Sequence, residues 1–151
     1  MEKDALKKLA VDSNKQTWDY LSKNNLNREE QLDALASAYT SLFFWLRCGT
    51  TLHQARGHWL ICRVAVIAGE YTLALRHAEL CQKFTGLSSD AKDFDVAYQW
   101  EALARAHALL NQTDLSGEYK LKAQSLGEQI ADPEDQKIFI TDFQAPPWSS
   151  K

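Results

Sequence analysis

The stretch AGEYTLALRHAEL, residues 68–80, contains the pattern that decides the fold. A turn built on Gly-Glu-Tyr leads directly into a segment with small residues at Ala74 and Ala78. Residues four apart lie on the same face of a helix. A small residue where a large one could sit indicates another backbone passing close by. This stretch therefore predicts a helix packed tightly against a neighbour.

On both sides of that turn, apolar residues recur with the 3.6-residue period of helices. We predict about seven helices and no strand. Helix-capping and helix-stopping residues set the expected boundaries: Asn27 with Glu30, Gly49, Thr50 or Thr51, Gly69, Gly86, Asp90 or Asp93, and Asp132-Pro133. The segment WLICRVAVIA, residues 59–68, is apolar on almost every side and predicts a central helix.

The expected architecture is a single all-α domain over residues 1–143, since 151 residues fit one domain. Helical hairpins are predicted at about 4–47, 52–84 and 94–130. A short capping helix follows at 133–143, and residues 144–151 form a tail. Trp148 in that tail can pack back onto the body of the protein.

Composition restricts the kind of partner and the compartment. A net charge of −3 argues against nucleic-acid binding, which needs a clustered basic surface. The longest apolar stretches are too short to span a bilayer, and the first ten residues contain no secretory signal. Three cysteines in apolar segments, an odd number, indicate reduced thiols. We therefore expect a cytoplasmic protein that binds neither nucleic acid nor membrane.

The segment that follows helix 52–68 resembles the second half of a tetratricopeptide repeat. Gly69, Tyr71, Ala74 and Cys81 match the family's turn and small-residue positions in order, and Ile61, Cys62 and Ala65 match positions on the preceding helix. A poorer second copy covers residues 94–130, with a period of 42 instead of the typical 34. The resemblance implies a right-handed superhelical array of antiparallel hairpins.

A second resemblance involves DFDVAYQWEALARA, residues 93–106, which is similar to a segment of small bacterial helical-repeat proteins. It implies no function. An irregular helical bundle without a repeat remains the structural alternative.

The tetratricopeptide resemblance implies a protein- or peptide-binding scaffold or adaptor, in which the first helix of each hairpin lines a concave groove. In this chain the groove residues are predicted to be Arg56, Trp59, Arg63, Tyr98, Glu101 and Arg105. Guanidinium groups can bind a carboxylate bidentately while an aromatic ring covers apolar atoms. The alternative is structural, with Glu101 and Arg105 as an i,i+4 pair and Trp59 in the core.

A second functional hypothesis is a small-molecule sensor or enzyme with a pocket between the helices at 52–68 and 94–110. The pocket would be lined by Trp59, Tyr98, Trp100 and His107. A third hypothesis is a homodimer formed through the aromatic band SLFFWL, residues 41–46.

No catalytic motif or cofactor-binding motif is recognisable, so we expect no cofactor and favour a non-catalytic protein. The pairs His58/Cys62 and His77/Cys81 have a spacing that could form a zinc site. The two histidines are expected to face in different directions, and no metal site is predicted.

Overall fold

The computed structural model of the protein describes residues 1–148 and contains seven α-helices in that range, with no strand among these residues. The helices are α1 (Lys3–Leu21), α2 (Arg28–Cys48), α3 (Thr51–Ala68), α4 (Tyr71–Leu87), α5 (Asp93–Leu109), α6 (Thr113–Glu128) and α7 (Pro133–Gln144). The predicted all-α class is confirmed. The last three residues of the predicted tail, 149–151, lie outside the described residues.

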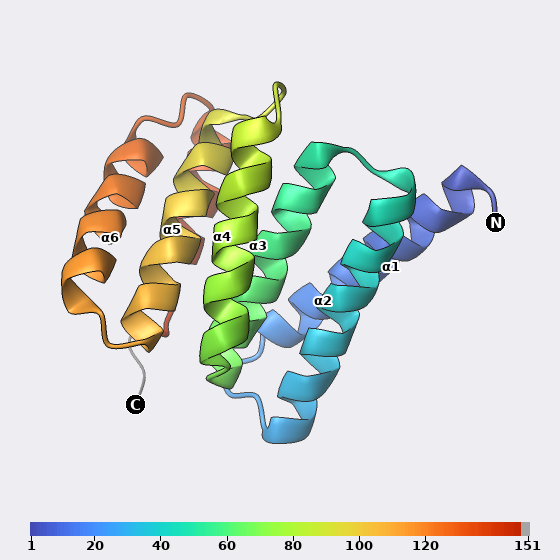
Figure 1. Cartoon of the computed structure of the whole chain (residues 1–151), viewed down its shortest axis with the longest axis horizontal. Helices are drawn as coiled ribbons and strands as arrows, with labels where there is room; N and C mark the ends of the chain where they lie inside the picture. The colour runs from blue at the N-terminus through green and yellow to red at the C-terminus, as the bar shows by residue number, and fades with distance from the viewer. Residues whose placement is uncertain (149–151) are drawn as a thin grey trace.

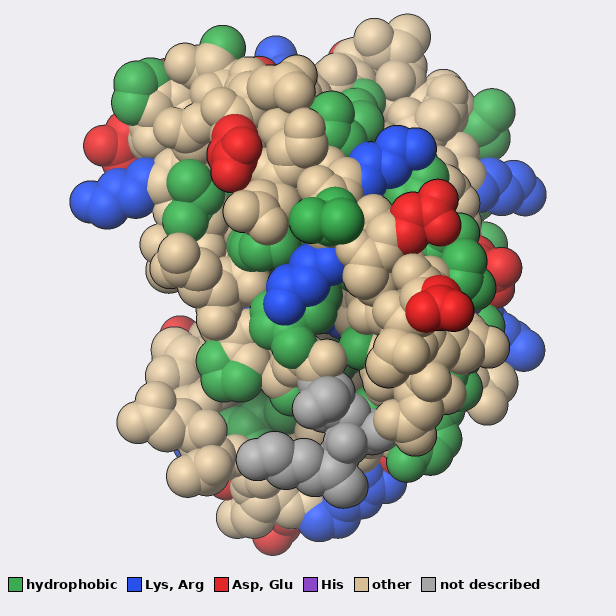
Figure 2. Space-filling view, turned by 90° about the vertical axis from the view of Figure 1, so that its left-hand side faces the viewer, with side chains coloured by type: hydrophobic (Ala, Val, Ile, Leu, Met, Phe, Trp, Pro, Cys, Tyr) green, Lys and Arg blue, Asp and Glu red, His purple; other side chains and the backbone are tan. Residues whose placement is uncertain are grey.

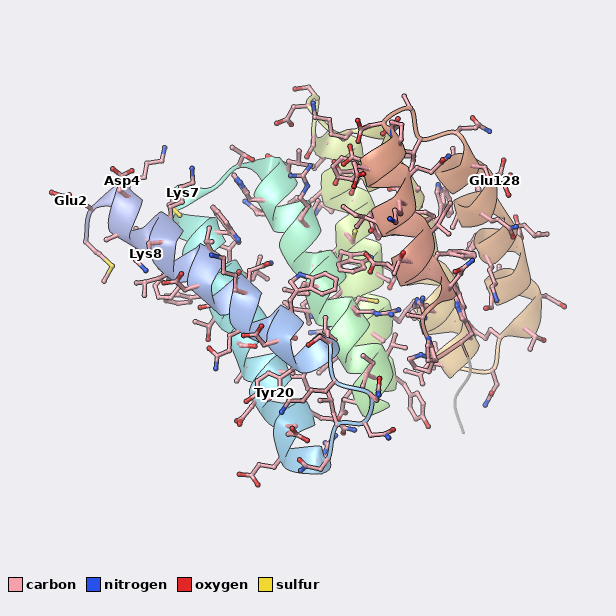
Figure 3. The ribbon with its side chains drawn as sticks, turned by 180° about the vertical axis from the view of Figure 1, so that it is seen from behind. Glu2, Asp4, Lys7, Lys8, Tyr20 and Glu128 are labelled. Carbon is pink, nitrogen blue, oxygen red and sulfur yellow. The ribbon has the colours of Figure 1, made fainter. Side chains whose placement is uncertain are left out.

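The helices form two layers of a hairpin array (Figure 1). The pairs α1–α2, α3–α4 and α5–α6 pack together, and each hairpin also contacts the next through α2–α3 and α4–α5. Helices α2, α4 and α6 form the outer layer. Helices α1, α3, α5 and α7 form the opposite, inner face (Figure 3). The expected side-by-side packing of α3 and α5 is confirmed; a right-handed superhelix stays a prediction.

The turn between α3 and α4 is the one that the Gly-Glu-Tyr sequence predicts. Gly69 has φ 71°, in the left-handed region that costs a glycine little, and α4 begins two residues later at Tyr71. Ala74 and Ala78 are fully buried, and α4 packs against both α3 and α5. Ala74 and Ala78 thus lie where α4 packs closely against its neighbours, as the sequence pattern predicts.

Three helix starts confirm their predicted caps. The Asn27 side chain accepts from the Glu30 backbone N–H at 2.8 Å, and the Glu30 carboxylate accepts from the Asn27 N–H at 3.1 Å. Thr50 caps α3, and Asp132 caps α7 with Pro133 in the first turn. These side chains satisfy backbone N–H groups that a helix start leaves without a partner.

Two boundary predictions are wrong. Helix α4 continues through Gly86 to Leu87, where the Ser88 hydroxyl donates to the Phe84 carbonyl at 2.7 Å and closes the helix end. At the start of α5 the side chain of Asp95, instead of Asp90 or Asp93, accepts from the Lys92 N–H at 2.9 Å.

Helix α6, the second helix of the hairpin predicted at about 94–130, runs from Thr113 to Glu128. It starts directly after the turn at Asn111, whose φ is 60°.

Two apolar clusters hold the helices together. The larger one draws on α2, α3, α4 and α5, and almost the whole length of α3 is buried in it, as a central helix requires. The smaller one joins α5, α6 and α7 around Phe139. A Cβ at Gly127 would lie 2.3 Å from the Phe139 ring, so α6 and α7 can approach closely only with glycine there.

Candidate functional site

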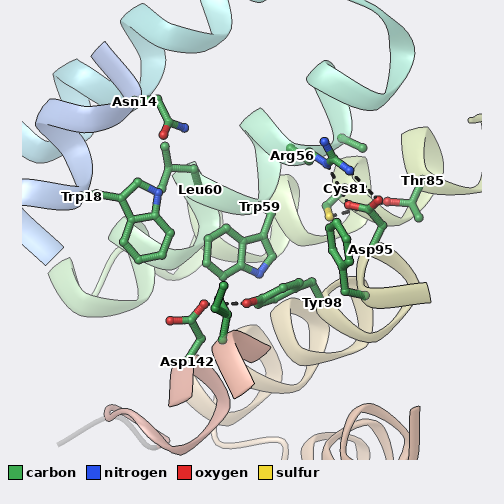
Figure 4. Close-up of a pocket in the computed structure, with 13 residues that line it drawn as sticks. Asn14, Trp18, Arg56, Trp59, Leu60, Cys81, Thr85, Asp95, Tyr98 and Asp142 are labelled. Carbon is green, nitrogen blue, oxygen red and sulfur yellow. Dashed lines mark hydrogen bonds and ion pairs between the residues drawn. The ribbon is translucent and has the colours of Figure 1, made fainter. Parts of the chain in front are cut away.

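The candidate site is a pocket of about 250 Å³ on the inner face, above α3 and α5 and between α1 and α7 (Figure 4). Its walls are largely apolar, and five of the seven helices contribute to them. The lining residues are Asn14 and Trp18 of α1; Ala55, Arg56, Trp59 and Leu60 of α3; Cys81 and Thr85 of α4; Phe94, Asp95 and Tyr98 of α5; and Ile138 and Asp142 of α7.

An aromatic wall runs across the pocket from α1 to α5. The rings of Trp18 and Trp59 are stacked, with centroids 5.8 Å apart and planes 23° from parallel. Tyr98 meets Trp59 edge to face at 5.0 Å. The Trp59 indole N–H donates to the Glu101 carboxylate at 2.7 Å, which fixes the orientation of that ring. The wall is therefore held in place before any ligand arrives.

An ion pair joins α3 to the first turn of α5 at the edge of the pocket. The Arg56 guanidinium donates twice to the Asp95 carboxylate, with both distances at 2.9 Å. Hydrogen bonding to Asp95 raises the pKa of Arg56 above its ordinary value. Because both carboxylate oxygens are occupied, this pair leaves little charge available to a ligand.

Behind the aromatic wall lies a buried group of charges on α3 and α5. Glu101 and Arg105 are each only 1 % exposed, and the Arg105 Nε donates to Glu101 at 2.5 Å. Arg63 is 8 % exposed, and its Nη1 lies 3.5 Å from the same carboxylate without a hydrogen-bond partner among the described residues. Two arginines thus share one carboxylate in a poorly hydrated region.

The end of α7 and the residues after it complete the coordination of Arg105. Its guanidinium donates to the backbone carbonyls of Asp142 at 2.9 Å, Phe143 at 3.2 Å and Pro147 at 2.8 Å. The Trp148 ring lies 4.0 Å from this guanidinium, and its indole N–H donates to the Phe143 carbonyl. The predicted packing of Trp148 onto the body is confirmed, and Arg105 fastens α7 to α5.

Asp142 is the carboxylate of α7 that faces the pocket. The Tyr98 hydroxyl donates to its Oδ2 at 2.6 Å (Figure 4). Burial raises the pKa of Asp142; the Tyr98 hydrogen bond and the charges of Arg63 and Arg105 oppose that rise without cancelling it. The pKa of Tyr98 is raised as well, mainly by burial. Asp142 is thus an incompletely compensated carboxylate.

The structure divides the six residues predicted to bind a partner into two groups. Arg56, Trp59 and Tyr98 line the pocket. Arg63, Glu101 and Arg105 lie in the buried charge group. All six belong to α3 and α5 and share the inner side of the array, but Arg56 and Arg105 are already held by partners within the chain.

The four residues of the small-molecule hypothesis do not all come together. Trp59 and Tyr98 line the pocket, whereas Trp100 and His107 pack against Tyr119 between α5 and α6, with centroids at 5.3 Å and 5.5 Å. Trp100 and His107 share one stripe of α5, and that stripe faces α6 instead of the inner face.

The expectation that His58 and His77 face in different directions is wrong. Their Nδ1 atoms lie 2.9 Å apart, and the Tyr39 hydroxyl contacts the Nε2 of His77 at 2.5 Å. Burial lowers the pKa of both histidines to about 4. Both are therefore neutral near neutral pH, with one ring donating to the other. Within residues 1–148 no three His, Cys, Asp or Glu side chains gather as a metal site.

Sequence reasoning missed Trp18, Asp95 and Asp142 as pocket residues. Trp18 belongs to α1, where no site is predicted, and Asp95 lies in the first turn of α5, where a carboxylate already has a structural explanation. Asp142 lies 44 positions after its partner Tyr98. No local pattern indicates such a contact, because it depends on how α7 folds back onto α5.

Charges of both signs are mixed on the surface of the protein. The face over α6 carries Lys, Arg, Asp and Glu side chains side by side, without a block of one sign (Figure 2). Among the described residues, no helix has the length and apolar character needed to cross a bilayer.

Searches of protein-family models, curated proteins and solved structures find no match to this chain.

Proposed function

We propose that the protein is a non-catalytic binding module, tetratricopeptide-like in design, whose inner face holds an extended segment of a partner protein or peptide. The pocket between α1 and α7 would receive one side chain of that segment. The observation that carries this proposal is the side-by-side packing of α3 and α5 beneath a preformed aromatic wall.

Rigidity of the wall supports recognition of a partner. Trp59 is oriented by Glu101, and Tyr98 by Asp142, so neither side chain has to be ordered when a partner binds. Each side chain immobilised on binding otherwise costs about 0.5–1.5 kcal/mol. Aromatic residues in well-packed pockets are also the residues that dominate binding energy at interfaces.

The size of the pocket favours a side chain over a whole small molecule. Pockets for drug-sized ligands usually measure roughly 300–1,000 Å³. The present volume of about 250 Å³ lies below that range. A metabolite-binding sensor or enzyme remains the second candidate, because the pocket is lined by Trp59 and Tyr98 as that hypothesis expects. A thermal-shift screen with metabolites tests it, since a ligand that binds only the folded state raises the melting temperature.

The proposal is tested by selecting random peptides displayed on phage against the protein and measuring their affinity for two variants. Ile138→Asn replaces an apolar side chain of the pocket lining with a polar one and adds no charge. Leu121→Asn is the matched control, because Leu121 is an exposed apolar residue of α6 away from the pocket. Truncating a central contact typically costs more than 1 kcal/mol, about fivefold in affinity.

We expect the selected peptides to bind wild type and Leu121→Asn equally and Ile138→Asn about fivefold more weakly or worse. Two results would count against the inner face as the binding surface: recovery of no peptide, or recovery of peptides whose affinity is the same for Ile138→Asn as for wild type.

A cytoplasmic location belongs to the same proposal. Its support is that Cys48, Cys62 and Cys81 are all free thiols.

A further inference from the structure

The charged side chains that line the pocket differ in whether they are paired with an opposite charge. Arg56 and Asp95 neutralise each other through two hydrogen bonds of 2.9 Å. The third charged residue of the lining is Asp142, whose only side-chain hydrogen-bond partner among residues 1–148 is the Tyr98 hydroxyl. Arg63 and Arg105 act on this carboxylate through their charge, and neither forms an ion pair with it in this range. The lining residues therefore carry one carboxylate in excess, and it lies beside the aromatic wall.

The nearby arginines do not offer an equivalent site for an anion. Arg105 is 1 % exposed and donates to Glu101 and to three backbone carbonyls. Arg63 is not part of the lining and lies within 3.5 Å of Glu101. An anion in the pocket would meet the Asp142 carboxylate first, and like charges repel strongly where water is scarce.

Ring faces supply the second component of a cation site. Trp18, Trp59 and Tyr98 all line the pocket, and the Asp142 carboxylate accepts from the Tyr98 hydroxyl at 2.6 Å (Figure 4). A cation within about 6 Å of an aromatic face is attracted by about 0.5–2 kcal/mol, and tryptophan binds cations best. A carboxylate beside such rings adds a charge-assisted hydrogen bond.

We infer that the pocket binds a positively charged side chain, Lys or Arg, that the partner segment presents to Trp18, Trp59 and Asp142. This inference rests on the proposed peptide-binding function and names what the pocket recognises. The apolar stem of the side chain packs against Leu60 and Ile138, and its charged end contacts Asp142.

The tests use the selected peptides with one position changed. In each peptide the residue whose replacement by alanine weakens binding most is substituted by Lys, Arg, norleucine or Glu. Affinities are measured by calorimetry for wild type, Asp142→Asn and Glu134→Gln. Glu134 is the matched control, because it is an exposed carboxylate of the same helix, away from the pocket.

We expect Lys or Arg at that position to bind at least tenfold more tightly than norleucine, and Asp142→Asn to remove the difference while Glu134→Gln leaves it intact. The inference is overturned if peptides bind equally well with norleucine or Glu at that position, or if their affinity for Asp142→Asn equals that for wild type. Either result would leave the proposed peptide-binding function unaffected. Failure to select any peptide overturns both.

A competition experiment distinguishes a peptide side chain from a small cationic molecule as the source of the bound cation. n-Butylammonium at the concentration of the Lys peptide is not expected to displace that peptide, because it lacks the contacts that the backbone of a segment makes along α3 and α5. Displacement at equal concentration would identify a small cationic molecule as the ligand and contradict a peptide side chain.

Discussion

At the scale of single residues, burial and hydrogen bonding act in opposite directions on the carboxyl group of Asp142. Burial raises its pKa, and the Tyr98 hydroxyl and two arginines reduce that rise without cancelling it. A group whose pKa is higher in the folded state than in the unfolded chain binds protons more readily when folded. Ionising Asp142 therefore destabilises the fold, the reverse of the usual case for an aspartate.

We expect Asp142→Asn to be more stable than wild type at neutral pH, because asparagine can still accept from Tyr98 and carries no charge to desolvate. The difference should shrink as pH falls through the raised pKa of Asp142 and vanish below the ordinary aspartate value, where wild type is neutral as well. Urea denaturation of both proteins across this pH range measures it. A variant that is less stable at neutral pH would show that the ionised carboxylate contributes to the fold.

At the scale of elements, glycine has opposite effects on stability at positions 69 and 117. Gly69 has φ 71° in the turn between α3 and α4, whereas Gly117 lies inside α6 with open space around it. An L-residue in the left-handed region costs about 1 kcal/mol, and glycine inside a helix costs about 1 kcal/mol relative to alanine.

We therefore expect Gly69→Ala to destabilise the protein and Gly117→Ala to stabilise it, each by about 1 kcal/mol. Thermal or urea unfolding of the two variants beside wild type provides the comparison. A Gly69→Ala variant as stable as wild type would mean that the α3–α4 turn does not depend on glycine as the repeat-like pattern implies, and a destabilised Gly117→Ala would contradict the prediction for α6.

Helix α2 carries an apolar stripe that the other helices leave partly exposed, although Tyr39 within it contacts His77 of α4. Leu32, Tyr39, Phe43 and Leu46 are between 37 % and 53 % exposed and recur at intervals of three, four or seven residues along one side of the helix. Such patches on a surface indicate contact with another protein or a second copy. The homodimer hypothesis stays open on this ground.

We expect weak self-association in the micromolar range through this stripe, because one helix face offers less than the roughly 1,600 Å² of a standard interface. Sedimentation velocity over a concentration series should show a rising mass for wild type and a constant monomer mass for Phe43→Arg. Leu121→Arg on α6 is the control. A wild type that stays monomeric at high micromolar concentration would exclude the homodimer.

At the scale of the whole molecule, the helices and most of their ends could be predicted because local residues determine them. Asn27, Thr50, Gly69 and Asp132 act within a few positions of themselves. The misplaced ends are local as well: α4 continues through Gly86, and the side chain that accepts at the start of α5 is that of Asp95, two residues after Asp93. Periodicity along α3 also indicated correctly that this helix is central.

The site could be predicted only in part. Arg56, Trp59 and Tyr98 follow from the inner side of α3 and α5, once these helices are expected to lie side by side. Trp18 and Asp142 come from α1 and α7, whose positions depend on tertiary packing across long stretches of chain. The internal use of Arg105 depends on residues 142–147 in the same way.

The proposed function depends most on the inner face being the surface that binds a partner. Two of the five tryptophans, Trp18 and Trp59, line its pocket, and Trp100 lies between α5 and α6 as an internal control. The most direct measurement is a titration with a selected Lys-containing peptide, followed by NMR at the indole N–H groups. We predict that the signals of Trp18 and Trp59 shift and that the signal of Trp100 stays in place. A shift of Trp100 with Trp18 and Trp59 unchanged would contradict the account.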